Sequence, residues 1–148
     1  MSAFEKLKGE HSIQLVLAQE LSRLTSKRDL PCKVELFHLR TKLASSLIRH
    51  LMEEDWVVYP SLLRSPDPCV QDAVRTLQLE SGMLADAFRA YMKRWTTVAI
   101  ELDWPTYCKE TSILLRALTR RMSREDLSLY GEVSANTERD LPSAACWG

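Results

Sequence analysis

Histidine and glutamate side chains fall on helical faces that are otherwise apolar. Between residues 4 and 21, apolar side chains recur at spacings of three and four, and His11 takes one of these positions. Between residues 36 and 57, the same spacing includes His50 and Glu54, which lie one helical turn apart on one face. Imidazole and carboxylate groups are the ligands expected for iron, manganese or zinc. These three residues are therefore candidate metal ligands.

Two further segments carry charged residues at inward positions. Glu80 interrupts the apolar stripe of residues 73–95, and Arg121 and Glu125 lie in the stripe of residues 114–129. An isolated ionised carboxylate in a core is costly, so it must be paired or ligated. Contributions from four segments are typical of an interior site built from facing helices. Hydrogen-bonded core histidines and a solvated Arg–Glu pair are the simpler interpretation, and periodicity leaves both open.

The apolar periodicity predicts four helices. They are expected over residues 3–25, about 31–63, about 67–98 and about 103–130. Pro31 suits the first position of the second helix, with Asp29 as a nearby cap. Pro60 is expected to kink or shorten the last turn of that helix.

Turn and capping signals separate these helices. Residues 27–30 form the first turn, and residues 65–68, which hold two prolines, form the second. Asp103, followed by Trp104 and Pro105, is typical of the start of the fourth helix. Gly131 suits the position after its end.

The length of 148 residues favours one domain. Residues 1–131 are expected to form it, and residues 132–148 are polar and predicted to be a disordered C-terminal tail. Long helices with short connections are antiparallel neighbours. The predicted fold is therefore all-α, an antiparallel up-down-up-down four-helix bundle.

Charge and composition limit the classes of partner and the compartment that can be expected for this protein. Lys and Arg number 20, as do Asp and Glu, so no electrostatic footprint for nucleic acid or an anionic membrane is expected. No apolar run approaches the roughly 18–20 residues of a membrane span, and residues 1–10 lack the apolar core of a signal peptide. The four cysteines form no CxxC pair, which suits a reducing compartment. We therefore expect a cytoplasmic protein.

The chain resembles the hemerythrin-like, or HHE cation-binding, domains over about residues 5–131. The strongest motif runs from His50 through Glu53 and Glu54 to Tyr59 and Pro60, and is similar to the family's HxxxE motif with its continuation. A second, altered copy begins at Arg121 and includes Glu125, Tyr130 and Gly131, with Arg121 where the family has histidine. Glu10-His11 resembles the family's first histidine. Glu80 stands where another histidine is expected.

This resemblance implies a non-heme di-iron centre that binds or senses oxygen, nitric oxide or iron, or stores iron. His11, His50, Glu54 and Glu125 match the family's ligands, whereas Glu80 and Arg121 do not. The two mismatches fall on one half of the site. We therefore expect a divergent member that binds one iron or similar ion, or two if the altered half still binds. An enzyme is not expected, because half of a di-iron oxidase ligand set is missing.

Charge leaves two interpretations of the cluster open. One divalent cation on His11, His50 and Glu54, with Glu125 or Glu80 as further ligands, would neutralise the carboxylates. Alternatively, protonated histidines and Arg121 pair with the carboxylates in a metal-free Arg-Glu-His network, because nearby carboxylates raise the pKa of a histidine. The protein would then be a regulatory or protein-interaction module.

The sequence also leaves open whether the protein binds a protein partner or forms a homodimer. Trp104 and Tyr107 are predicted to form an exposed apolar end that could support a dimer.

Overall fold

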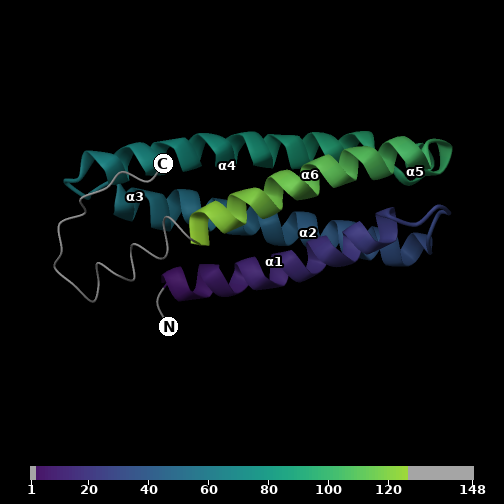
Figure 1. The fold of residues 1–148 in the computed structure, drawn as a ribbon, viewed down its shortest axis with the longest axis horizontal. Coiled ribbons are helices and arrows are strands. Elements are labelled where there is room, and N and C mark those ends of the chain that lie inside the picture. Colours follow the sequence, from purple (N-terminus) through teal and green to yellow (C-terminus); the bar gives the residue numbers. More distant parts are fainter. Residues whose placement is uncertain (1–2, 127–148) are drawn as a thin grey trace.

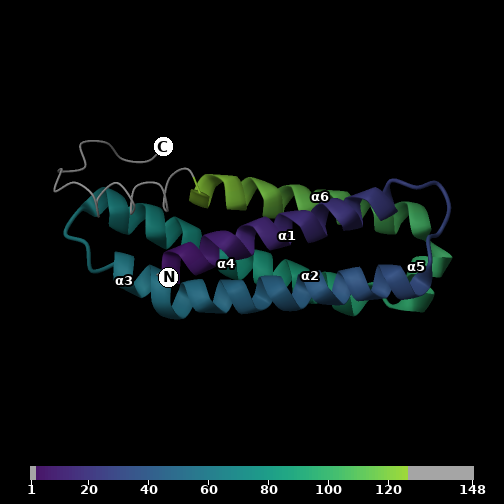
Figure 2. The ribbon, with the colours of Figure 1, turned by 90° about the horizontal axis from the view of Figure 1, so that it is seen from below.

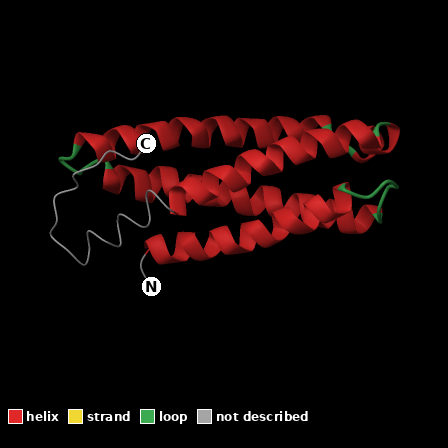
Figure 3. Ribbon diagram, in the orientation of Figure 1, coloured by secondary structure: helices red, strands yellow, loops and turns green. Residues whose placement is uncertain are grey.

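The computed structural model describes residues 3–126, and this part of the chain is helical with no strand (Figure 3). The prediction of an all-α protein is confirmed. The helices are α1 (Ala3–Thr25), α2 (Lys33–Glu53), the π-helical turn η1 (Glu54–Val58), α3 (Tyr59–Leu62), α4 (Pro68–Arg94), α5 (Thr97–Leu102) and α6 (Trp104–Arg124). The predicted tail of residues 132–148, and the predicted helix end at Tyr130 and Gly131, lie outside the described residues.

The four longest helices, α1, α2, α4 and α6, lie lengthwise beside one another (Figures 1 and 2). The helix α1 packs against α2 and α6, and α4 packs against the same two helices. The turn between α1 and α2 lies at the same end as α5, whereas α3 lies at the opposite end (Figure 1). Inward-facing side chains of the four helices therefore meet along one shared interior.

The second helix differs from its prediction at both ends. It begins at Lys33 with Cys32 as its N-cap, so Pro31 precedes the helix and Asp29 does not cap it. At its other end, Pro60 lacks an N–H and cannot continue a regular helix. The chain widens instead into η1, where the N–H of Tyr59 bonds to the carbonyl of Glu54.

The predicted third helix is two helices. The side chain of Asp67 accepts a hydrogen bond from the N–H of Cys69 (2.9 Å) and caps α4, as its sequence suggests. The helix ends at Arg94, not at Val98. Thr96 accepts a hydrogen bond from the N–H of Ala99 (3.2 Å) and starts α5, because its side chain caps a new helix better than it continues the old one.

The start of α6 agrees with the sequence. Asp103 accepts a hydrogen bond from the N–H of Thr106 (3.3 Å). Trp104 and Tyr107 are buried here, and the indole of Trp104 donates to the carbonyl of Lys27 (3.1 Å). The prediction that these two aromatics form an exposed apolar end is therefore wrong.

Three cysteines lie in the described part of the chain, and they differ in their bonding. Cys32 and Cys108 are free, whereas Cys69 is disulfide-bonded. A disulfide at Cys69 is not what a reducing compartment favours. Among residues 3–126, no helix has the length and apolar character needed to cross a membrane.

Candidate metal centre

Two histidines from different helices meet in the interior. His11 lies in the middle of α1, and His50 lies in the last turn of α2. Their Nε2 atoms are 2.8 Å apart, and the ring centroids are 4.6 Å apart. Both side chains are buried, with 3% of His11 and 1% of His50 exposed. The sequence prediction that these histidines face one interior is confirmed.

A carboxylate holds the other nitrogen of each ring. Asp126 Oδ1 lies 2.9 Å from Nδ1 of His11, and Glu10 Oε2 lies 2.8 Å from Nδ1 of His50. A carboxylate only accepts hydrogen bonds, so each Nδ1 carries the proton. When both rings are neutral, the lone pairs of the two Nε2 atoms then face each other. Carboxylates hold the histidine ligands of metal sites in this way.

Glu54 completes a group of three ligand atoms. Its Oε1 lies 3.0 Å from Nε2 of His50, and one ligand atom each from Glu54, His50 and His11 lies within 4.8 Å of the other two. Glu54 is fully buried. It begins η1, and this wide turn buries both Val58 and Tyr59.

The separations of these atoms fit one ion. Two ligands on one metal, each about 2.1 Å from it and at right angles, lie about 3.0 Å apart. The separations of Nε2 of His50 from Nε2 of His11 and from Oε1 of Glu54, 2.8 and 3.0 Å, are close to that value. Two imidazoles and one carboxylate are a ligand set for Fe(II), and three protein ligands leave coordination positions open. All three ligand atoms lie within 4.8 Å of one another, so the residues present fit a single metal ion once their side chains close around it.

Without an ion, one proton must lie between the two imidazoles. Burial lowers the pKa of His50, but hydrogen bonds and charges from Glu54 and Glu10 outweigh burial and raise it above its ordinary value. Burial and the nearby His50 lower the pKa of His11, against the opposing effect of Asp126. The proton therefore belongs to His50, whose Nε2–H is shared between two acceptors, Nε2 of His11 and Oε1 of Glu54.

The other half of the cluster is filled by Arg121. Its Nη1 lies 3.4 Å from Oε1 of Glu54 and also pairs with Glu125, while its Nη2 donates to the hydroxyl of Tyr59. The Tyr59 hydroxyl donates to Glu54 (3.1 Å) and lies 3.5 Å from Glu125. All four side chains are buried. Arg121 thus supplies the positive charge that the two carboxylates need.

The pKa values of this half follow from burial and charge. Burial raises the pKa of Glu54, but hydrogen bonds with Glu125 and His50, with the charge of Arg121, outweigh it and hold that pKa well below its usual range. Burial lowers the pKa of Arg121, but Glu125, Tyr59 and Glu54 outweigh burial and raise that pKa above its ordinary value. Burial raises the pKa of Tyr59 strongly. Arg121 therefore stays charged and Tyr59 stays neutral.

The cluster as a whole has a surplus of negative charge. The hydrogen bond between Glu54 and Glu125 needs one proton, so the carboxyl groups of Glu10, Glu54, Glu125 and Asp126 carry three negative charges between them. Arg121 supplies one positive charge, which leaves minus two when both imidazoles are neutral, and the exposed Lys6 lies 4.0 Å from Glu10. A divalent cation would bring the charge of the buried groups to zero, and a proton on His50 brings it to minus one. The electrostatics therefore favour a cation beside His50.

The structure does not bring Glu80 to this cluster. Its side chain is 31% exposed and pairs with Arg124 (2.8 Å) at the edge between α4 and α6. The buried residue at this level of α4 is Ser81. The α4 stripe follows residues 77, 81, 84 and 88, so Glu80 lies one position off it.

Sequence reasoning missed Glu10, Asp126 and Tyr59. Glu10 neighbours His11 in the chain but bonds to His50, and Asp126 neighbours Glu125 but bonds to His11. No spacing in a single sequence predicts such crossed pairs, because each depends on how two helices are placed side by side.

Comparison with known families, with curated proteins and with solved structures finds no match to this chain.

Proposed function

We propose that this protein is a divergent hemerythrin-like metal-binding protein with an up-down-up-down four-helix bundle, and that it holds one non-heme iron. His11, His50 and Glu54 are its ligands. The observation that carries the proposal is the pair of Nε2 atoms facing each other at 2.8 Å, each on a ring whose Nδ1 is held by a carboxylate. Two neutral imidazoles in this arrangement repel unless a cation lies between them.

The chemistry of this site favours binding over catalysis. Iron on two imidazoles and one carboxylate keeps open positions, which suit a diatomic ligand such as oxygen or nitric oxide. A di-iron oxidase needs a carboxylate and histidine set from all four helices. Here Arg121 takes the space beside Glu125 and Glu54, and Glu80 pairs with Arg124 instead of joining the cluster. We therefore propose sensing or storage of iron or a diatomic gas.

The test is metal content after loading with Fe²⁺ without air and removal of loose metal. We expect about one iron per chain, because the three ligands converge on one point. The His50→Ala variant should hold none. His38→Ala is the matched control, since His38 is exposed on the same helix. Circular dichroism establishes that each variant is folded. Equal iron in the wild type and in folded His50→Ala protein would refute the proposal.

One observation favours a second candidate, a metal-free regulatory or protein-interaction module. Arg121 already balances Glu54 and Glu125, and a proton on His50 already joins the two rings. In that case Fe²⁺, Zn²⁺ and Mn²⁺ would all fail to bind stoichiometrically to the loaded wild type. The same loading experiment therefore separates the two candidates.

A further inference from the structure

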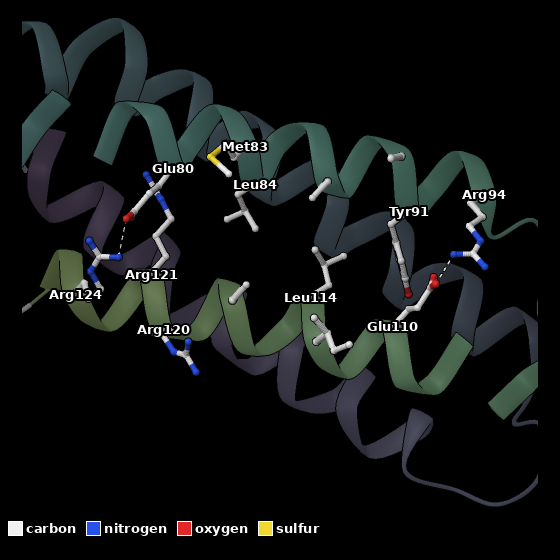
Figure 4. Close-up of a pocket in the computed structure, with 14 residues that line it drawn as sticks. Glu80, Met83, Leu84, Tyr91, Arg94, Glu110, Leu114, Arg120, Arg121 and Arg124 are labelled. Atoms are coloured by element: carbon white, nitrogen blue, oxygen red, sulfur yellow. Dashed lines mark hydrogen bonds and ion pairs between the residues drawn. The ribbon is translucent and has the colours of Figure 1, made fainter. Parts of the chain in front are cut away.

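A groove of about 640 Å³ runs between α4 and α6 (Figure 4), and neither His11 nor His50 lines it. Leu84, Tyr91 and Leu114 line it from the core side. Met83 and Ile113 line it as well and are 64% and 58% exposed. The volume is that of a small-molecule site, which usually measures about 300–1,000 Å³ and is mostly apolar.

Alanines keep the groove open. Among residues 5–126, the exposed alanines are Ala87, Ala90 and Ala117, and all three line this groove. The first two lie on α4, and Ala117 faces them from α6. A longer side chain at any of these positions would fill the space between the helices. The exposed alanines of residues 5–126 are thus gathered in this groove.

One end of the groove is rich in arginine. Arg120, Arg121 and Arg124 line this end with Glu80, which pairs with Arg124. Figure 4 shows Arg121 reaching from α6 towards α4 beside Glu80. At the far end, Arg94 and Glu110 form an ion pair. The lining therefore holds four arginines against two glutamates. Arg124 pairs with Glu80, and Arg121 pairs with Glu54 and Glu125 behind the groove. Arg120 therefore carries the positive charge at this end that no acidic side chain among the described residues balances.

Arg121 also carries a donor that lacks an acceptor. Its side chain is 5% exposed, and its terminal nitrogens are taken by Glu54, Glu125 and Tyr59. Its Nε–H is buried and has no hydrogen-bond acceptor among the described residues. A buried donor without an acceptor is costly. An anionic oxygen at this end of the groove would supply that acceptor.

We propose that this groove binds a free aliphatic carboxylate of the fatty-acid class. The carboxylate lies at the Arg120 and Arg121 end, and the alkyl chain runs along the three alanines towards Tyr91. Charge complementarity at one end and apolar lining along the rest match the two parts of such a molecule. This proposal goes beyond the metal site and does not depend on bound iron.

The first experiment measures decanoate binding to the whole chain by calorimetry, below the concentration at which decanoate forms micelles. Decanol and decyltrimethylammonium serve as uncharged and cationic probes of the same chain length. We expect decanoate to bind one per chain and the other two to bind at least roughly tenfold more weakly, because only the carboxylate meets the arginines. Equal binding of decanol, or no decanoate binding, would overturn the proposal.

Two pairs of variants locate the site. Ala117→Trp should fill the groove and weaken decanoate binding at least roughly tenfold, whereas Ser45→Trp, on the exposed face of α2, should leave it unchanged. Ala90→Trp repeats the test from α4. Arg120→Gln should weaken decanoate but not decanol, and Arg116→Gln, exposed on α6 outside this groove, is its control.

Oligomeric state completes the test. Concentration-dependent dimerisation that Ala117→Trp abolishes would mean that a second copy of the chain occupies the groove, and would overturn the proposal. Decanoate binding that survives in both folded tryptophan variants would do so as well.

Discussion

Arg121 and Glu54 form an ion pair, with Nη1 and Oε1 3.4 Å apart, in which the arginine is 5% exposed and the glutamate is fully buried. Glu54 also lies 3.0 Å from Nε2 of His50. One carboxylate thus joins the histidine half of the cluster to the arginine half. A substitution of Arg121 should therefore change the surroundings of Glu54, the candidate ligand.

Replacing Arg121 by methionine should destabilise the metal-free protein by about 3–5 kcal/mol. Methionine keeps much of the length of the side chain but removes the charge that Glu54 and Glu125 need in a buried place. Urea unfolding in the presence of a chelator measures the effect as a change in the free energy of unfolding.

Arg124→Met is the matched control for that variant. Arg124 lies in the same turn of α6 and pairs with Glu80, but both side chains are partly exposed, so its loss should cost less than about 1 kcal/mol. Similar losses for the two variants would show that the buried carboxylates do not depend on Arg121.

The metal-free protein should lose stability as the pH rises from 6.5 to 8. The folded-state pKa of His50 lies above its unfolded value, so the stability that its proton provides is complete below about 6.5 and is lost as pH passes through the folded pKa. The slope is at most about 1.4 kcal/mol per pH unit for one proton. Unfolding free energies from urea titrations at several pH values measure it.

The chosen pH window isolates His50. His11 has a lowered pKa, so it costs stability only as pH falls below about 6.5. Burial raises the pKa of the Cys108 thiol, which matters only above pH 8. His50→Gln should flatten the slope, and His38→Ala should leave it unchanged. A slope that persists in His50→Gln would assign the proton to another group.

Helical periodicity predicted the interior side chains that follow the stripe of one regular helix. His11, His50, Glu54, Arg121 and Glu125 are each no more than 5% exposed, as their spacing implied. This works because a regular helix repeats its direction every 3.6 residues. The ends marked by Asp67 and Asp103 were also predictable, because a capping carboxylate acts on a backbone N–H close by in the chain.

Periodicity failed where the helix changed its pitch. The sequence places Val57 inward, but Val57 is 53% exposed and Val58 is 1% exposed, because the π-helical turn before Pro60 shifts the stripe by one residue. Glu80 and Ser81 fit the α4 stripe equally well by spacing. Burying the hydroxyl costs less than burying the carboxylate, and the structure buries Ser81.

Removing the charge of a carboxylate behind a histidine should weaken iron binding without removing a ligand. Asp126→Asn and Glu10→Gln keep an oxygen that accepts the hydrogen bond from Nδ1, but the ring becomes less basic. Loss of such partners typically lowers metal affinity about 10- to 100-fold. Competition with a chelator of known affinity measures the change.

Glu53→Gln is the control for these two variants. Glu53 adjoins Glu54 in the chain but pairs with Lys6 and is partly exposed. Its loss should leave the iron affinity unchanged. An equal effect of all three variants would mean that general surface charge, not the carboxylate–histidine pairs, sets the affinity.

The wild-type protein should distinguish Fe²⁺ or Zn²⁺ from Mg²⁺. Imidazole nitrogen suits the first two ions, whereas Mg²⁺ prefers oxygen and keeps its water. At a free ion concentration 100-fold above the dissociation constant, Fe²⁺ or Zn²⁺ should stabilise the fold by about 2.7 kcal/mol. Mg²⁺ at the same concentration should leave the melting temperature unchanged, and His50→Ala should respond to none of the three. Equal stabilisation by Mg²⁺ would mean that exposed carboxylates bind the ion, because the buried site offers Mg²⁺ a single carboxylate, that of Glu54, beside two imidazole nitrogens.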